Sequence, residues 1–157
     1  NVINETFGDV DLIAGVATGA IAQGALVAQE MGLPFAYVRS SSKGHGLENL
    51  IEGNVQSGQS VVVIEDLIST GKSSLAAVKA LRSAGCNVKG MIGIFTYNLS
   101  IATENFEKSD CKLVTLADYD TMIKKAVESN YISDSDIHSL VKWRENPKKW
   151  GEKKASK

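Results

Sequence analysis

The chain of 157 residues contains little cysteine, has no excess of either charge and has no long apolar run. Its two cysteines, Cys86 and Cys111, form no CxxC pair and have no histidine nearby. They offer no disulfide framework and are expected to be reduced, partly buried thiols of a cytosolic protein. The formal net charge of −1 provides no broadly basic surface for nucleic acid. With no apolar run of spanning length and no segment typical of a signal peptide, we expect no membrane association.

The remaining composition is that of one soluble globular domain, with 43% hydrophobic and 22% charged residues. We expect this single domain to cover residues 1–157, with a flexible, solvated basic tail at 146–157. The chain begins with Asn1 rather than Met, and Ile3 and Phe7 resemble the last turns of a helix that Gly8 ends. It is therefore expected to be a fragment, or a chain whose beginning is absent from this sequence.

Apolar stretches of two kinds alternate along the chain. Strands are expected at 11–14, 34–39, 50–52, 60–65, 88–96 and 112–115, and helices at 20–31, 70–84, 101–109, 118–128 and 133–146. The strands lack an alternation of polar and apolar residues, so we expect an α/β fold with a mostly parallel sheet covered by helices on both faces. Ligands of such sheets bind at the carboxyl ends of the strands. The loops at 16–19, 40–49 and 65–73 share that edge.

Residues 61–73 read VVVIEDLISTGKS and are the most informative stretch. An apolar strand leads into Glu65 and Asp66, a hydroxyl-rich turn follows, and an amphipathic helix begins after it. Free backbone N–H groups and the positive end of the helix dipole favour an anion, above all phosphate, at such a turn. Carboxylates cannot be ligands of phosphate, but they suit sugar hydroxyls or a metal ion. The stretch therefore predicts a site for a ribose 5-phosphate.

The same stretch contains Gly71, Lys72 and Ser73, which invites comparison with a Walker A loop. That pattern, GxxxxGK[ST], requires glycine where this chain has Asp66, and a carboxylate there would repel a triphosphate. We therefore reject a nucleoside-triphosphatase. An ordinary capped helix would explain the small turn residues, but it leaves two adjacent acids at the end of a core strand unexplained, where desolvation is costly.

With strand, acid pair, hydroxyl-rich turn and helix in this order, the stretch resembles the phosphoribosyl-diphosphate (PRPP) motif of type I phosphoribosyltransferases. The resemblance implies their Rossmann-like fold. It also implies that Glu65 and Asp66 contact the ribose 2- and 3-hydroxyls, with Asp66 among the catalytic residues. The rest of the PRPP site would be the turn that wraps the 5-phosphate: Leu67, Ile68, Ser69, Thr70, Gly71, Lys72 and Ser73.

A second motif, RSSSKGHG at 39–46, is followed by IEG at 51–53 and resembles the flexible catalytic loop of orotate phosphoribosyltransferases. Arg39 would hold phosphoryl oxygens in a fork, Lys43 would supply a mobile charge, and His45 would donate a hydrogen bond or proton. These groups suit a strongly anionic leaving diphosphate and an oxocarbenium-like ribose. In that family the loop reaches the active site of the neighbouring subunit. The resemblance thus implies a homodimer with shared sites.

The chain departs from the family pattern in several places. Ser40 stands where many members have a second basic residue, and the loop at 15–19 lacks the lysine that many carry. That loop would either bind diphosphate through its backbone N–H groups or serve tight packing. Residues 96–98 lack an arginine that contacts orotate in some members, whereas Ser69 matches the family's orotate contact. The N-terminal hood segment of the family is missing from this sequence.

The resemblance implies an orotate phosphoribosyltransferase, an enzyme that converts orotate and PRPP to orotidine 5-phosphate and diphosphate in pyrimidine nucleotide synthesis. Mg²⁺ would be the cofactor, held mainly through PRPP rather than by direct protein ligands. The expected location is the cytoplasm, with neither nucleic acid nor membrane as a partner. Two alternatives stay open: a non-catalytic regulator that senses PRPP, and a transferase for a purine base or uracil.

Overall fold

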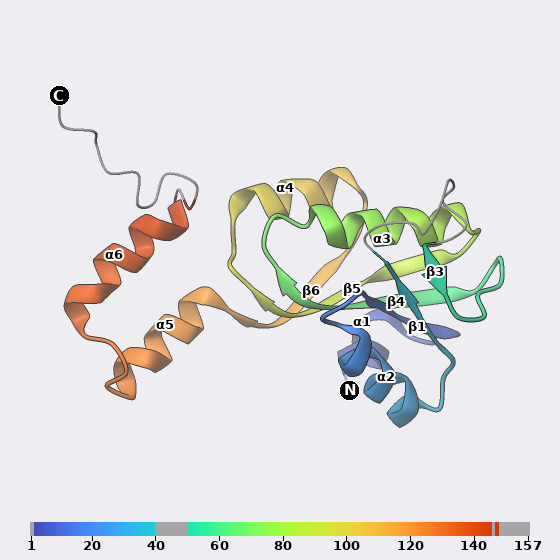
Figure 1. Ribbon diagram of the computed structural model, residues 1–157, viewed down its shortest axis with the longest axis horizontal. Coiled ribbons are helices and arrows are strands. Elements are labelled where there is room, and N and C mark those ends of the chain that lie inside the picture. Colours follow the sequence, from blue (N-terminus) through green and yellow to red (C-terminus); the bar gives the residue numbers. More distant parts are fainter. Residues whose placement is uncertain (1, 40–49, 146, 148–157) are drawn as a thin grey trace.

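The computed structural model describes residues 2–39, 50–145 and 147 (Figure 1). Every expected helix and strand is present, with ends shifted by a few residues. The elements in order are α1 (Val2–Phe7), β1 (Leu12–Val16), α2 (Ile21–Met31), β2 (Phe35–Val38), β3 (Ile51–Glu52), β4 (Ser60–Ile68), α3 (Lys72–Ser83), β5 (Asn87–Thr96), α4 (Ser100–Lys108), β6 (Leu113–Asp118), α5 (Tyr119–Glu128) and α6 (Asp134–Glu145). Apart from Pro147, the tail predicted at 146–157 lies outside the described residues.

The described strands form one six-stranded sheet in the order β3-β2-β1-β4-β5-β6. All neighbouring pairs are parallel except β2 and the short edge strand β3, which are antiparallel. The chain moves from β1 outward to β2, then returns to β4 on the other side of β1 and continues to β5 and β6. The strand order therefore reverses between β1 and β4, and this is the position where open α/β sheets bind ligands.

Helices cover both faces of the sheet, as the near-continuous apolar strands predict (Figure 1). On one face, α3 and α4 pack on strand residues such as Leu12, Val61 and Val63. On the other face, α1 and α2 pack on the alternate positions, including Val62 and Ile64. Because neighbouring strand residues point to opposite faces, an unbroken apolar run serves both cores at once.

The last two helices, α5 and α6, extend away from the sheet (Figure 1). Asp118 caps α5 as expected, with its carboxylate accepting a hydrogen bond from the Thr121 N–H at 2.8 Å. Tyr97, Tyr119 and Trp143 join α6 to the ends of β5 and β6, with ring centroids 5.3–5.9 Å apart. Among the helices of the described ranges, none has both the length and the apolarity to cross a lipid bilayer.

Candidate active site

The β4–α3 connection differs from its prediction in one respect. The strand was expected to end at Glu65 and the helix to begin at Thr70. In the structure β4 continues to Ile68, because Leu67 and Ile68 still pair with Phe95 and Thr96 of β5. The acids consequently lie within the strand, and only residues 69–71 remain for the turn.

The turn ends at Gly71, which is the N-cap of α3. Its φ of 76° is in the left-handed region, where glycine has no steric penalty, and it provides no side-chain cap. The first N–H groups of α3 have no partner within the helix, and they stand at the positive end of its dipole. This is the arrangement that the sequence predicts for a phosphate site.

The side chains of the turn differ in exposure. Ser69, Lys72 and Ser73 are exposed and Thr70 is half-buried, so each is accessible to solvent. Leu67 is 40% exposed, whereas Ile68 is fully buried in the core. A contact between Ile68 and a ligand would therefore involve the backbone alone.

The two acids of the motif have different surroundings. Glu65 is only 4% exposed, and its oxygens accept hydrogen bonds from the Ser74 hydroxyl at 2.6 Å and from the Asp66 N–H at 3.1 Å. Burial, reinforced by the nearby Asp66, raises the pKa of the Glu65 carboxyl to about 7, although the Ser74 hydrogen bond opposes the rise. Asp66 is half-buried. Of the two carboxyl groups, that of Asp66 is the more accessible to a ligand.

The β1–α2 loop lies directly on the Asp66 carboxylate. A Cβ added to Gly19 would be 1.8 Å from Asp66 Oδ2, so no larger residue fits there. Gly15 is equally crowded, since a Cβ there would be 2.6 Å from the Ala20 carbonyl oxygen. These close approaches give the small residues of this loop a packing role, one of the two roles the sequence left open.

Arg39 follows β2 at the same edge of the sheet. The loop after β1 reaches this strand through the Ala17 N–H, which donates to the Val38 carbonyl at 2.8 Å. The Arg39 guanidinium lies 3.5 Å from Glu52 Oε1 on β3, and its side chain is 27% exposed. The structure thus brings Arg39 to the edge that holds Asp66. Lys43 and His45, the other expected members of the catalytic loop, lie outside the described residues, as does Ser40.

Two residues that the sequence analysis did not single out contact the motif. Ser74 donates to Glu65, and Asn105 of α4 donates its side-chain N–H to the Thr70 carbonyl at 2.9 Å. Ser74 stands one position beyond the recognised motif. Asn105 is 35 positions from Thr70, so no local pattern could have indicated the contact.

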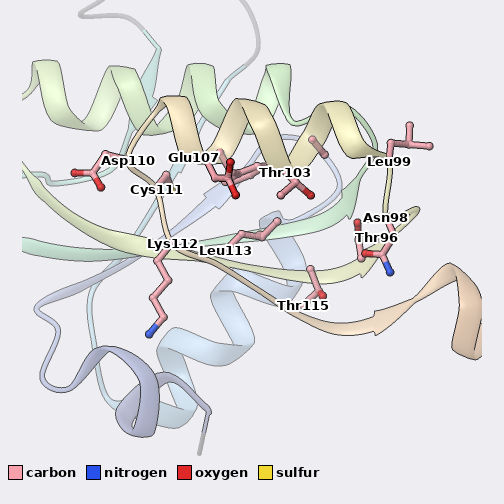
Figure 2. A pocket seen from close by; sticks show the side chains of 12 residues that line it. Thr96, Asn98, Leu99, Thr103, Glu107, Asp110, Cys111, Lys112, Leu113 and Thr115 are labelled. Carbon is pink, nitrogen blue, oxygen red and sulfur yellow. Dashed lines mark hydrogen bonds between the residues drawn. The ribbon is translucent and has the colours of Figure 1, made fainter.

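A cavity of about 500 Å³ lies apart from this site, between α4 and the strands β5 and β6 (Figure 2). It is lined by hydroxyl and apolar side chains, among them Thr96, Thr103 and Leu113, and by none of the predicted site residues. A second, more apolar groove of about 560 Å³ runs between α1, α2 and the sheet. The candidate site therefore coincides with neither of these two cavities and lies at the carboxyl ends of the strands.

A parallel sheet whose strand order reverses beside an anion-binding turn and a carboxylate is the architecture of a phosphoribosyltransferase. The family model for the phosphoribosyl transferase domain matches residues 1–129, and the chain belongs to this family. Within it, the chain belongs to the orotate phosphoribosyltransferases. The enzyme of that name from Porphyromonas gingivalis is 59% identical over 150 residues, which covers 96% of this chain and 71% of that protein.

Two further relatives agree with this placement. The orotate phosphoribosyltransferase of Phocaeicola vulgatus is 55% identical over 149 residues, covering 95% of this chain and 70% of that protein. The crystal structure of the Aeropyrum pernix enzyme of the same name superposes with a TM-score of 0.70 at 30% identity, covering 78% of this chain and 68% of that one. The expectations of a type I phosphoribosyltransferase fold and of this family are confirmed.

The raised pKa of Glu65 predicts a pH-dependent stability. The carboxyl has an ordinary pKa of 4.5 and a folded-state pKa of about 7, so the folded chain holds this proton more tightly. The stabilisation is complete below the ordinary pKa and is lost as pH rises through the folded one. We expect the Tm of the wild type to fall by several degrees between about pH 5 and about pH 8, at on the order of 3 °C per kcal/mol of lost stability. Glu65→Gln should remove this fall, because glutamine does not titrate. Thermal denaturation across this range measures it.

Glu107→Gln is the matched control, because Glu107 is an exposed carboxylate on α4. It should retain the pH dependence of the wild type. An identical fall in Tm for the wild type and Glu65→Gln would refute the assignment of this proton to Glu65.

Proposed function

We propose that this chain catalyses the replacement of diphosphate on C1 of PRPP by a ring nitrogen of orotate, giving orotidine 5-phosphate. The C1–O bond to the diphosphate breaks, and its electron pair leaves with the diphosphate. A bond from the ring nitrogen to C1 forms, and the ring nitrogen releases its proton to solvent. The observation that carries the proposal is the juxtaposition of the uncapped α3 N-terminus with Asp66 at the reversal of the strand order. The names of the similar proteins support orotate as the base.

The 5-phosphate of PRPP would bind at the residue 69–71 turn. Backbone N–H groups at the start of α3 would donate to its oxygens, together with the hydroxyls of Thr70 and Ser73. Lys72 is exposed at the first position of the helix and would add a positive charge. Ser69, exposed in the same turn, is our proposed contact to orotate.

The ribose would lie over Asp66, whose carboxylate accepts hydrogen bonds from the 2- and 3-hydroxyls. We propose a supporting role for Glu65 in place of an equal share of the ribose, because both of its oxygens already accept hydrogen bonds from within the chain. Glu65 therefore fixes the start of α3 through Ser74 and the backbone of Asp66. Each oxygen has a second lone pair, but Glu65 is only 4% exposed, so direct contact with the ribose would require the surrounding residues to move.

Magnesium is the proposed cofactor, and the donor set at the crevice fits it. Among the described residues, no group of three or more His, Cys, Asp or Glu side chains could hold a metal ion. Mg²⁺ retains water and substrate oxygens and needs few carboxylates, so Asp66 beside the bound PRPP is sufficient. When bound, the ion neutralises charge on the diphosphate.

The leaving diphosphate would be stabilised by Arg39, Lys43 and His45. Their positive charges and N–H donors oppose the charge that develops as the bond to C1 lengthens. We propose that they act on the PRPP of a partner subunit in a homodimer with shared sites, as the resemblance implies. Arg39 would then exchange its contact with Glu52 for phosphoryl oxygens, and a contact as long as 3.5 Å is readily given up.

We place the reaction in the cytoplasm. Cys86 and Cys111 are both free and buried, which suits a reducing compartment. We also propose that residues 1–157 act as one phosphoribosyltransferase domain, since the six-stranded sheet binds both helical layers through continuous cores.

The first test is ultraviolet absorbance of orotate with PRPP and Mg²⁺ present. We expect loss of orotate that requires all three components, with equimolar formation of diphosphate. Turnover of adenine, hypoxanthine or uracil in place of orotate would support a transferase for another base. Binding of PRPP without turnover of any base would support a sensor.

Lys43→Ala should lower kcat far more than it weakens PRPP binding. A group that acts mainly on developing charge contributes little to the ground state. We expect kcat to fall by about 100-fold, the loss typical of removing one donor to a transition-state charge, while KM for PRPP changes less than about threefold. Steady-state kinetics provide both values. Lys79→Ala on the exposed side of α3 is the control. Equal losses in kcat and PRPP affinity would contradict the role.

Asp66→Asn should weaken PRPP capture, because a charged acceptor for the ribose hydroxyls becomes neutral. We expect the Kd for PRPP to rise by about 10- to 100-fold, from a loss of about 1.5–3 kcal/mol for a hydrogen bond to a charged group. Isothermal titration calorimetry measures the Kd. Asp9→Asn, at an exposed position before β1, should bind as the wild type does. Unchanged affinity in Asp66→Asn would remove Asp66 from the ribose site.

A further inference from the structure

Helix α4 contacts the phosphate turn although it follows it by some thirty residues. The Asn105 side-chain N–H donates to the Thr70 carbonyl at 2.9 Å. Thr70 is the middle residue of the turn, so this hydrogen bond holds the backbone just before the N-terminus of α3. The bond is partly buried, which protects it from competing water.

The neighbouring residue on α4 fixes the next position of the turn. Phe106 is 3% exposed, and a Cβ added to Gly71 would be 2.6 Å from its ring. The ring therefore lies directly against the Gly71 backbone, which is itself in the left-handed region. Two neighbouring residues of α4 thus contact two consecutive residues of the turn. Asn105 forms a hydrogen bond with Thr70, and Phe106 makes van der Waals contact with Gly71.

Because a peptide group is planar, the hydrogen bond to the Thr70 carbonyl also fixes the direction of the Gly71 N–H. The Thr70 carbonyl and the Gly71 N–H belong to one planar trans peptide group, in which they point in opposite directions. Asn105 holds the carbonyl oxygen toward α4. The Gly71 N–H is thereby directed away from α4, and rotation of the peptide plane would bring a carbonyl oxygen toward a bound anion instead.

Helix α4 is itself held in place at its far end. The Arg82 guanidinium of α3 donates to the carbonyls of Ser109 and Asp110, both at 2.7 Å. The face of α4 that carries Ala102 and Phe106 packs on the core and borders the cavity of about 500 Å³ between α4 and the strands β5 and β6 (Figure 2). Phe106, Arg82 and the Asn105 bond therefore act together in placing α4 beside the turn.

We propose that Asn105 is a positioning residue for the 5-phosphate of PRPP: it holds the Thr70–Gly71 peptide so that the Gly71 N–H faces the phosphate. The inference rests on the proposed function, and it assigns a role in that site to a residue outside both sequence motifs. Asn105 itself contacts no substrate.

The test compares Asn105→Ala and Asn105→Leu with Glu104→Ala. Leucine is close in size to asparagine but is uncharged and has no N–H donor, so loss of the donor is separated from loss of volume. Glu104 is exposed on the same helix, where it forms a surface ion pair with Lys108. Calorimetric titration with ribose 5-phosphate reports phosphate binding without catalysis, and steady-state kinetics add KM and kcat.

We expect the Kd for ribose 5-phosphate to rise by about 3- to 10-fold in both Asn105 variants, the effect of one hydrogen bond of about 1 kcal/mol. KM for PRPP should rise in parallel, while KM for orotate and kcat stay close to the wild type. The Gly71 amide resonance should shift on ligand binding in the wild type and Glu104→Ala, and shift less in the Asn105 variants.

The outcomes separate this inference from the proposed function. If the wild type binds no ribose 5-phosphate, the proposed function fails. If the wild type binds it and both Asn105 variants bind it equally well, Asn105 has no positioning role. A fall in kcat with unchanged KM for PRPP would also overturn the inference, because it indicates fewer folded molecules rather than a misplaced donor. Should Asn105→Ala unfold, Asn105→Leu decides.

Discussion

The pairing of β4 with β5 as far as Ile68 and Thr96 is the constraint on which the site depends. It continues the strand beyond the acids, so that Glu65 and Asp66 point to opposite faces of the sheet. It also leaves so short a turn before α3 that Gly71 adopts a left-handed conformation. The buried carboxyl of Glu65, the half-buried carboxylate of Asp66 and the uncapped helix end are therefore consequences of one strand pairing.

Much of this was predictable, because the signals are local. The apolar run at 61–64, the acid pair and the hydroxyl-rich turn each reflect the chemistry of neighbouring residues, and they placed strand, turn and helix in the correct order. The mostly parallel sheet with helices on both faces also followed from the lack of alternation, since only a sheet covered on both faces hides such runs. The order of the strands was not predicted. What local signals could not supply was the end of β4, because hydrogen bonds to β5 decide it.

The different surroundings of Glu65 and Asp66 also could not be predicted from neighbouring residues. In sequence they are neighbours, and the family resemblance gives both of them a contact with the ribose hydroxyls. Their difference comes from Ser74 of α3 and from the backbone of Gly19, which approaches the Asp66 carboxylate from another loop. A sequence predicts that a carboxylate is near a site, but its protonation and accessibility depend on which segments fold against it.

The loop after β1 consists of small residues and lacks the lysine that the family resemblance leads one to expect. Its small residues either bind diphosphate or pack closely. Gly19 can approach Asp66 only because it has no side chain. This contact holds the loop backbone beside the carboxylate, and the Ala17 N–H of the loop already donates to the Val38 carbonyl. The structure therefore supports close packing as the role of these small residues, and diphosphate binding by the loop stays a prediction.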